Sequence, residues 1–504
     1  MKRTLLAIAC PLPRFAATLA VLSLVGLGAP AQSRPLSLEQ CVQMAVRRNP
    51  TVLSKQIQVQ IAETDVQGTL GPFDWLLNAQ VSFSNNDMPS FSRFDAGTDL
   101  TSKAFSLSRT EDLLWGASVS KRFVSGTKIE LGFNDAYVYR SSSFYLQNRW
   151  FTGNWHVTAT QNFLKGFGLF YNRADTVAAR KNRDIEWLRK SDAVNQVVLD
   201  AVTAYWELVF AQEDLQIKKS ALEVSKVQER DTDARMKAGQ LTETDLLSAK
   251  HLVAQREEAL LTAENNLTNA RETLRKVIGT SVLGPDTTAV DKPTPIQVGA
   301  DLKSSIEKTL SQHYGLLVYK MQSERQRVLT KKSRLDKWPS LDLSVTVGQN
   351  GLGTNYGRNL ESLFKFKAGY LEVMLSFSMP LGNDLAKANY RRNQLQEQKL
   401  DTDSEILRRE LYAQVSKAVR NLDLSQKRVR VSDVLLRLST RKLETANELL
   451  KLGKMTYQEH LQHQQELEDA RVKRLRALVD VRLSQAQLQA LRAELLDRFR
   501  VKVQ

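Results

Sequence analysis

A long stretch without proline, from about Asp384 to Leu452, constrains the fold of this chain more than any other feature. Large aliphatic residues recur in it every seven positions, at Val415, Leu422, Val429, Leu436, Leu443 and Leu450. Small residues follow the first five of these by three positions, at Ala418, Ser425, Ser432, Ser439 and Ala446. This repeat predicts coiled-coil packing with closely approaching backbones. At about 1.5 Å per residue the helix would span roughly 100 Å, which no compact domain needs.

A second stretch, from about Asn172 to Lys237, carries the same spacing. Its repeating positions are Trp187, Val194, Ala201, Leu208, Leu215 and Leu222. Shorter helices are predicted at about 37–70, 242–278, 300–337 and 456–499. The first two together are about as long as one long helix, so we expect two short helices to lie end to end beside it.

Segments that alternate apolar and polar residues are the second type of element. They run from Phe73 to Phe83, Trp115 to Phe123, Ile129 to Tyr139, Trp155 to Phe163, Leu341 to Val347 and Leu371 to Phe377. A half-buried soluble sheet and the strands of a transmembrane β-barrel both have this period of two. Aromatic residues at the strand ends favour the barrel.

The connections between these segments are expected to differ in length. Those at about 86–112, 140–153 and 349–368 are predicted to be long loops, and the one between Phe123 and Lys128 a short turn. We assign Gly348, Gly351, Gly353 and Gly357 to such a loop. Long loops on one side and short turns on the other are typical of outer-membrane barrels.

The N-terminal residues 1–31 resemble a secretory signal peptide. Basic residues precede an apolar run from Phe15 to Leu27, and Ala29-Pro30-Ala31 supplies small residues for cleavage after Ala31. Lipidation at Cys10 is a weaker alternative, because too little apolar sequence precedes it. Cleavage would leave Cys41 alone, without a disulfide partner. No later apolar run is long enough for a transmembrane helix, so we expect an exported chain, either soluble or in the outer membrane as a barrel.

The two halves of the chain repeat the same order of elements. Gly239 and Asp245, six positions apart, correspond to Gly453 and Glu459 in the second half. We expect four parts: a signal peptide (1–31), a first repeat (32–278), a linker (279–299) and a second repeat (300–504). The first repeat carries an extra hairpin at about 114–139.

Composition and motifs point away from catalysis. The chain has five His and two Cys, and no nucleophile is paired with a base, so we expect no enzyme, no cofactor and no metal site. His460 and His463 lie near Glu459 and Glu466 at a metal-like spacing, but we interpret them as a solvated helix face. The formal net charge is +16. Because Lys and Arg are scattered, often near Glu or Asp, we expect no nucleic-acid partner.

Four segments resemble the TolC-like outer-membrane efflux proteins. They are Leu36–Gln40 with Asn49-Pro50, Gln161–Gly168 with Asn172-Arg173-Ala174, Lys237–Leu246 and Lys451–Glu459. The resemblance covers essentially the whole chain after the signal peptide. It implies a mixed α and β membrane protein, in which a trimeric transmembrane β-barrel is continued by a periplasmic α-helical coiled-coil barrel. Most of such a chain projects from the outer membrane into the periplasm.

The implied function is a passive exit duct of a tripartite efflux or type I secretion system. Its partners would be two further copies of the chain, outer-membrane lipid, a periplasmic adaptor (membrane fusion) protein and an inner-membrane transporter. Four to six strands cannot close a barrel, so three chains would supply twelve strands, or eighteen if the 114–139 hairpin joins the wall. The alternative function is a periplasmic coiled-coil scaffold or adhesin without a pore.

The candidate site residues lie where the long helices reverse direction. Glycine at a helix end supplies a positive φ, which is a sufficient structural reason for Gly239 and Gly453. The resemblance implies that these tips narrow the periplasmic mouth and contact the adaptor. The contact candidates are Gly239, Gly453, Leu241, Leu452 and Met455.

Two acidic residues are the pore-gate candidates. The resemblance implies an acidic ring at Glu459, and Asp245 holds the corresponding place in the first repeat. We prefer Glu459, because Asp245 could instead cap its own helix. Gln462, Leu450 and Met455 depart from the residues that the family uses at its tip.

Overall fold

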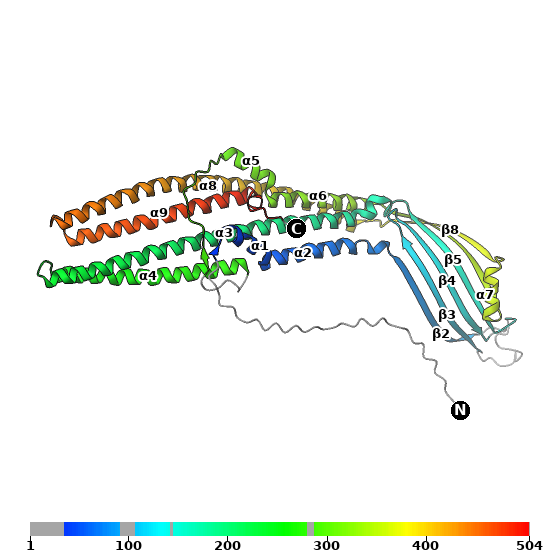
Figure 1. The fold of residues 1–504 in the computed structure, drawn as a ribbon. Coiled ribbons are helices and arrows are strands. Elements are labelled where there is room, and N and C mark those ends of the chain that lie inside the picture. Colours follow the sequence, from blue (N-terminus) through cyan, green and yellow to red (C-terminus); the bar gives the residue numbers. More distant parts are fainter. Residues whose placement is uncertain (1–34, 91–105, 142–144, 280–286, 503–504) are drawn as a thin grey trace, which may run out of the picture.

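The computed structural model describes residues 35–90, 106–141, 145–279 and 287–502, so the predicted signal peptide at 1–31 lies outside it. The molecule is elongated, with a curved sheet at one end and long helices over the rest of its length (Figure 1). Within the described residues, no helix is both long enough and apolar enough to cross a membrane.

Each half of the chain contributes one very long helix. The helices of the first half are α1 (Leu38–Arg48), α2 (Pro50–Gly68), α3 (Gly168–Lys237) and α4 (Glu243–Ile278). Those of the second half are α5 (Leu302–Gln312), α6 (Tyr314–Leu335), α8 (Asp384–Lys451), α9 (Tyr457–Leu491) and α10 (Leu495–Arg498). Near the sheet the packing order is α2-α3-α6-α8, and at the far end it is α4-α3-α9-α8.

Three helices that the sequence predicted as continuous are each broken in two. The segment 456–499 is divided into α9, which ends at Leu491, and the short α10. The segment 37–70 breaks at Asn49, whose side chain accepts a hydrogen bond from the Thr51 amide at 2.8 Å and so starts α2. The cause is Pro50, which disfavours helical geometry in the residue before it. The segment 300–337 breaks at His313, where Nδ1 accepts from the Gly315 amide at 3.1 Å.

The predicted seam of α8 is buried at all five small positions and at three of its six large ones, while Leu436, Leu443 and Leu450 are partly buried. Its buried members are Val415, Leu422 and Val429 together with the small residues Ala418, Ser425, Ser432, Ser439 and Ala446. In α3 the repeat is buried at Val194, Ala201, Leu208 and Leu222, but Trp187 at its start is 45% exposed. The heptad interpretation is therefore wrong for the end of α3 that is nearest to the sheet.

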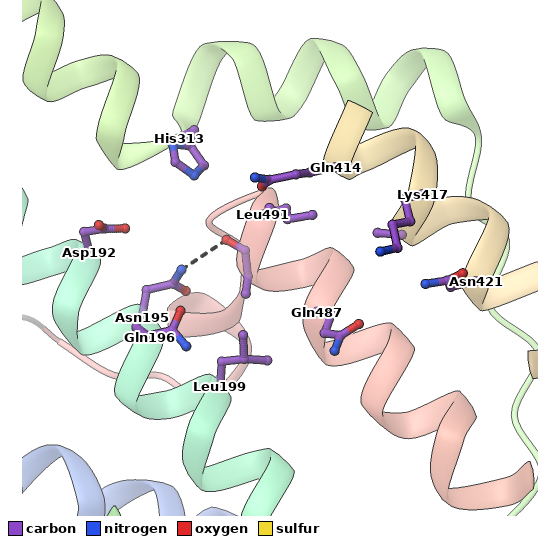
Figure 2. A pocket seen from close by; sticks show the side chains of 12 residues that line it. Asp192, Asn195, Gln196, Leu199, His313, Gln414, Lys417, Asn421, Gln487 and Leu491 are labelled. Carbon is purple, nitrogen blue, oxygen red and sulfur yellow. Dashed lines mark hydrogen bonds between the residues drawn. The ribbon is translucent and has the colours of Figure 1, made fainter. Parts of the chain in front are cut away.

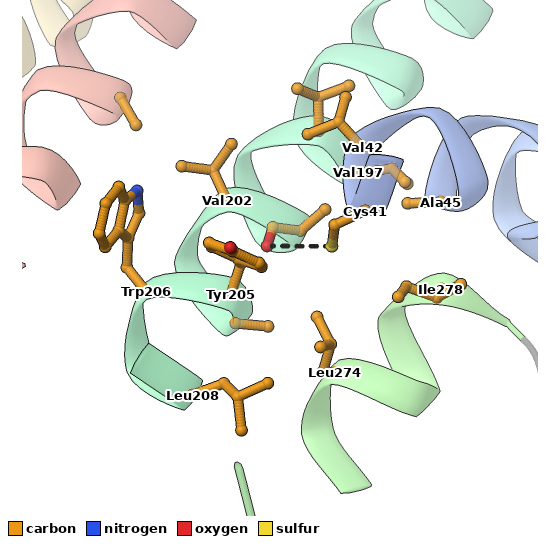
Figure 3. Packing of buried hydrophobic residues seen from close by; sticks show 14 of the residues in the cluster. Cys41, Val42, Ala45, Val197, Val202, Tyr205, Trp206, Leu208, Leu274 and Ile278 are labelled. Carbon is orange, nitrogen blue, oxygen red and sulfur yellow. Dashed lines mark hydrogen bonds between the residues drawn. The ribbon is translucent and has the colours of Figure 1, made fainter. Parts of the chain in front are cut away.

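The largest hydrophobic core lies midway along the helices, where α1, α3, α4, α9 and α10 meet (Figure 3). Tyr205 of α3 is fully buried there, and its hydroxyl donates to the Leu36 carbonyl at 3.0 Å. Cys41 is also fully buried, and burial raises the pKa of its thiol to about 12. A thiol with so high a pKa is chemically inert.

One antiparallel sheet of six strands forms the other end of the molecule. Its order is β2 (Trp75–Ser90), β3 (Ser106–Arg122), β4 (Thr127–Arg140), β5 (Arg149–Asn162), β7 (Ser340–Gly353) and β8 (Gly369–Ser378). The hairpin predicted at 114–139 is β3–β4, and it lies inside this sheet, not outside it as an appendage. Two-residue strands β1 (Pro35–Leu36) and β6 (Thr288–Ala289) pair with each other near the core.

The strand register separates two faces. The apolar face carries a cross-strand row formed by Val119, Leu131, Val157, Val347 and Leu371, and Leu77 extends that row to β2. The polar face carries hydroxyl and amide side chains that hydrogen-bond across strands. Two such contacts join Thr158 to Thr346 at 2.9 Å and Asn162 to Asp342 at 2.6 Å. This is the alternation that the sequence predicted.

The strands are longer than predicted, and the loops correspondingly shorter. β2 and β3 extend into the expected 86–112 loop, where Arg109 pairs with Asp87 at 2.9 Å. β5 begins at Arg149, inside the expected 140–153 loop. Cross-strand pairing therefore continues into polar segments that the sequence analysis predicted to be loops.

The glycine-rich loop prediction is wrong for three of its four glycines. Gly348, Gly351 and Gly353 belong to β7, and a short helix that was not expected, α7 (Tyr356–Phe364), follows them. A Cβ on Gly353 would lie 2.2 Å from the Asn359 amide nitrogen. Gly351 and Gly353 are needed because α7 packs directly on the strand, whereas Gly348 leaves room for the ring of Tyr370 on β8.

The seam yields a stability prediction. Replacing the 7%-exposed Ser432 by Leu should overfill the contact between α8 and α9, at a cost of roughly 1–3 kcal/mol. The adjacent Val431 is 69% exposed, so Val431→Leu is the matched control and should be neutral. Thermal unfolding followed by circular dichroism measures both; equal melting temperatures for the two variants would contradict the seam assignment.

Candidate functional site at the helical tips

The two helix reversals are built in the same way. In the first, Gly239 has φ +73°, its amide donates to the Met236 carbonyl, and the Gln240 amide donates to the Arg235 carbonyl. In the second, Gly453 has φ +67° and its amide donates to the Leu450 carbonyl. This hydrogen-bond pattern is a Schellman motif, which requires a left-handed residue. Nothing lies within 4 Å of a Cβ placed on either glycine, so backbone conformation alone explains them.

The pore-gate candidates occupy equivalent positions after these turns. Thr242 and Asp245 form a capping box at the start of α4, and Thr456 and Glu459 form one at the start of α9. The Glu459 carboxylate accepts from the Thr456 amide at 3.0 Å and from its hydroxyl at 2.8 Å. These hydrogen bonds hold the pKa of Glu459 below its usual value. Since both acids cap their own helices, the reason for preferring Glu459 over Asp245 does not hold.

The apolar contact candidates lie around the same two turns. Leu452 is 67% exposed, whereas Leu241 and Met455 are only partly exposed. An exposed leucine at the end of a helical hairpin is available to a partner. The structure brings Leu452, Gly453 and Met455 together in one tip, and Gly239 and Leu241 in the other.

The two tips are joined by side chains that the sequence analysis did not single out. Tyr457 begins α9, packs against Leu252 of α4, and accepts a hydrogen bond from Thr232 of α3 at 2.8 Å. One turn further, His460 Nδ1 lies 3.2 Å from Gln228 Nε2 of α3, and His460 Nε2 lies 2.6 Å from Asn447 Oδ1 of α8. The histidine therefore connects three helices.

This contact overturns the interpretation of His460 as part of a solvated helix face. The residue is only 4% exposed, and burial lowers the pKa of its ring from the usual 6.5, with His463 acting in the same direction. The neutral ring can donate from Nε2 to Asn447 and accept at Nδ1 from Gln228. Within the described residues, no group of three His, Cys, Asp or Glu could hold a metal ion.

Ionic contacts continue the connection between α3 and α9 away from the tips. Glu468 is 5% exposed and pairs with Lys218 of α3 at 2.6 Å and with Arg256 of α4. Arg476 pairs with Glu207 of α3 at 2.8 Å. Tyr457, His460 and Glu468 lie on the same face of α9. Polar residues at helical spacing on a face that packs against another helix were the pattern in the sequence that could have revealed these contacts.

A polar cavity of about 320 Å³ lies further along, where α3, α8 and α9 meet the break at His313 (Figure 2). Asn195 donates to the Ala490 carbonyl at 3.1 Å, and Asp192 and His313 face the same space. Burial raises the pKa of Asp192 and lowers that of His313, and the charge of each group partly offsets the shift of the other. Burial thus favours the neutral form of both groups.

The tip junction predicts a pH dependence. Because the pKa of His460 is lowered, its contribution is complete above pH 6.5 and is lost as the pH falls through the lowered value. Acidification should therefore loosen the α3–α9 contact at the tips, and His460→Gln should remove this pH response. Hydrogen exchange of the tip peptides at about pH 7.5 and 5.5, corrected for intrinsic rates, measures the change.

The exposed His251 on α4 offers the matched control, since His251→Gln also removes one histidine near the tips. The pH response should survive in that variant. A response that persists in His460→Gln would show that another group controls the contact.

Solved structures share this arrangement of helices and strands. The Campylobacter jejuni CmeC outer membrane channel superposes with a TM-score of 0.65 at 15% identity, covering 91% of this chain and 85% of that one. The Neisseria gonorrhoeae MtrE outer membrane channel gives 0.61 at 16% identity, covering 91% and 89%. Likeness at this level of identity shows the fold alone, which is the mixed α and β fold of these outer membrane channels.

Sequence comparisons give two partial matches. Residues 154–280 match the family described as outer membrane efflux protein. The outer membrane protein TolC of Escherichia coli K12 is 28% identical over 204 residues, which is 37% of this chain and 38% of TolC, so the match spans less than two thirds of that relative. The predicted resemblance to the TolC-like outer-membrane efflux proteins is confirmed as a similarity over these residues and in the fold.

Proposed function

We propose that this chain is one subunit of a passive outer-membrane exit duct. The single observation that carries the proposal is the sheet, which has an exposed apolar face, a polar face and two unpaired edges. Helices about 100 Å long continue it, a length suited to crossing the periplasm. Such a duct does no chemistry, and the energy for transport comes from an inner-membrane partner.

The sheet edges support assembly into a closed barrel. β2 and β8 each have a partner on one side only, so a row of backbone groups on each is unpaired within the chain. In hydrocarbon an unsatisfied backbone group costs several kcal/mol, and only closure removes it. Pairing of β2 in one copy with β8 in the next closes a ring, and three copies of a six-stranded sheet give eighteen strands.

The tips are the proposed contact for a periplasmic adaptor of an efflux or secretion system. A groove of about 530 Å³ lies beside them between α4 and α9, and its lining includes Leu247, Leu252 and Leu461. Leu247 is 60% exposed. The other lining residues are polar, and a groove of this mixed character between two helices fits a third amphipathic helix, which is a common mode of protein recognition.

The transported cargo is proposed to be small molecules or polypeptides.

The competing function is a periplasmic scaffold or adhesin without a pore. It uses the same helices but requires both faces of the sheet to be exposed to water. Fractionation and planar-bilayer recording separate the two. Membrane-bound protein that conducts supports the duct, and a soluble pool without conductance supports the scaffold.

The two faces of β8 provide the sharpest test of the barrel. Val373 on the apolar face is 61% exposed and its neighbour Met374 on the polar face is 52% exposed, so in a single chain in water either accepts Arg. In a lipid-embedded barrel, Val373→Arg should cost about 2–4 kcal/mol, and Met374→Arg should be nearly neutral. Heat-dependent migration of the trimer on gels measures the difference. Equal stability of the two variants would argue against lipid on the apolar face.

The acidic tip residues predict ion selectivity. If three copies of Glu459 converge at the periplasmic mouth, their charges should make the pore prefer cations and admit block by multivalent cations. Glu459→Gln keeps a capping oxygen and should weaken both properties without changing trimer assembly. Asp245→Asn is the matched variant, because it makes the same change in the equivalent capping box. Unaltered selectivity in both variants, recorded in planar bilayers, would remove the acidic ring from the mouth.

A further inference from the structure

A lysine contacts aromatic rings on the apolar face of the sheet, at the end that is nearest to the helices. Lys121 is on β3, one residue before the strand ends, and register places it beside Trp75 of β2. Its ammonium lies 4.9 Å from the centroid of the Trp75 ring and 6.0 Å from that of Phe123. No ion pair of Lys121 is found in the described part of the chain.

The surface around Lys121 carries several exposed aromatic residues. Trp75 is 68% exposed, Phe163 45% and Phe167 53%, and the last two rings stack at 6.5 Å. All of these residues lie where the strands meet the helices. Exposed aromatic residues at one end of an apolar face are typical of a membrane interface, at the level of the lipid headgroups.

Two more lysines at this junction have the same environment. Lys331 of α6 lies 4.2 Å from the ring of Phe170, and Lys337 lies 4.5 Å from the ring of Tyr390. A lysine stem can lie along an apolar surface while the ammonium reaches polar headgroups, and a ring contact leaves its N–H groups free to donate. Lys121, Lys331 and Lys337 therefore form a lysine collar where sheet and helices meet.

We propose that Lys121 binds the phosphate of a glycerophospholipid in the periplasmic leaflet of the outer membrane. The inference rests on the proposed function, because the helices define which end of the sheet is periplasmic. Charge complementarity selects the occupant: a cation without a carboxylate partner, held by rings at headgroup level, fits an anionic phosphate. Anionic lipid should bind better than zwitterionic lipid, since the latter carries its own ammonium.

The opposite face of the same hairpin supplies the control. Lys128 follows the turn after Lys121, lies on the polar face and pairs with Glu130 at 2.7 Å. Lys128→Gln and Lys121→Gln thus remove the same charge at the same end of the sheet, on opposite faces. Lys121→Arg keeps the cation and tests whether charge is the requirement.

The experiment titrates the detergent-purified protein with phosphatidylglycerol and counts retained lipids by native mass spectrometry. One lysine near a membrane surface is worth about 1 kcal/mol, so Lys121→Gln should weaken binding about fivefold, with Lys121→Arg and Lys128→Gln close to wild type. Unchanged binding in Lys121→Gln, an equal loss in Lys128→Gln, or equal binding of phosphatidylcholine would overturn the proposal.

Conductance of the same preparations separates this inference from the function on which it rests. Wild-type protein that conducts, with lipid binding insensitive to Lys121, refutes the lipid site and leaves the duct intact. Wild-type protein that neither enters membranes nor conducts refutes the duct, and the lipid site with it.

Discussion

The close approach of paired helices is the constraint on which the rest of the structure depends. A helix as long as α3 or α8 is stable in water only if it buries a continuous stripe. Small residues at every second seam position of α8 let α9 approach closely, and the capped turn at Gly453 brings α9 back antiparallel to it. The same turn at Gly239 returns α4 along α3. Length, antiparallel return and the position of the tips all follow from this pairing.

Much of this architecture could be predicted because it depends on local periodicity. The heptads, the strand alternation and the turn glycines are each visible within a short window of sequence, and the structure has helices, strands and turns there. What could not be predicted depends on contacts between distant segments. α7 exists because glycines of β7 leave room for it, and the burial of His460 is decided by Gln228 and Asn447. Which of Glu459 and Asp245 is the better pore-gate candidate depended on the hydrogen bonds of the two helix caps, which the sequence alone does not show.

Between the central core and the tips, the joint between the two halves is lined with polar contacts, in contrast to its apolar packing within the core. Tyr457, His460, Glu468 and Arg476 of α9 all meet polar partners on α3. Hydrogen bonds and ion pairs of this kind contribute little net stability but are costly to leave half made. Loss of one partner at this joint would therefore leave the other polar group buried and unpaired.

The position of the β3–β4 hairpin inside the sheet also sets the width of each subunit. Six strands spaced about 4.8 Å apart and tilted about 40° cover close to 38 Å of circumference. The row α2-α3-α6-α8, at about 9.5 Å per helix, covers nearly the same arc. Without the hairpin, four strands would cover about 25 Å, and the wall would have to taper by a third at the junction. With it, sheet and helices have matching widths, so in the proposed trimer the wall would continue from one to the other as a straight cylinder.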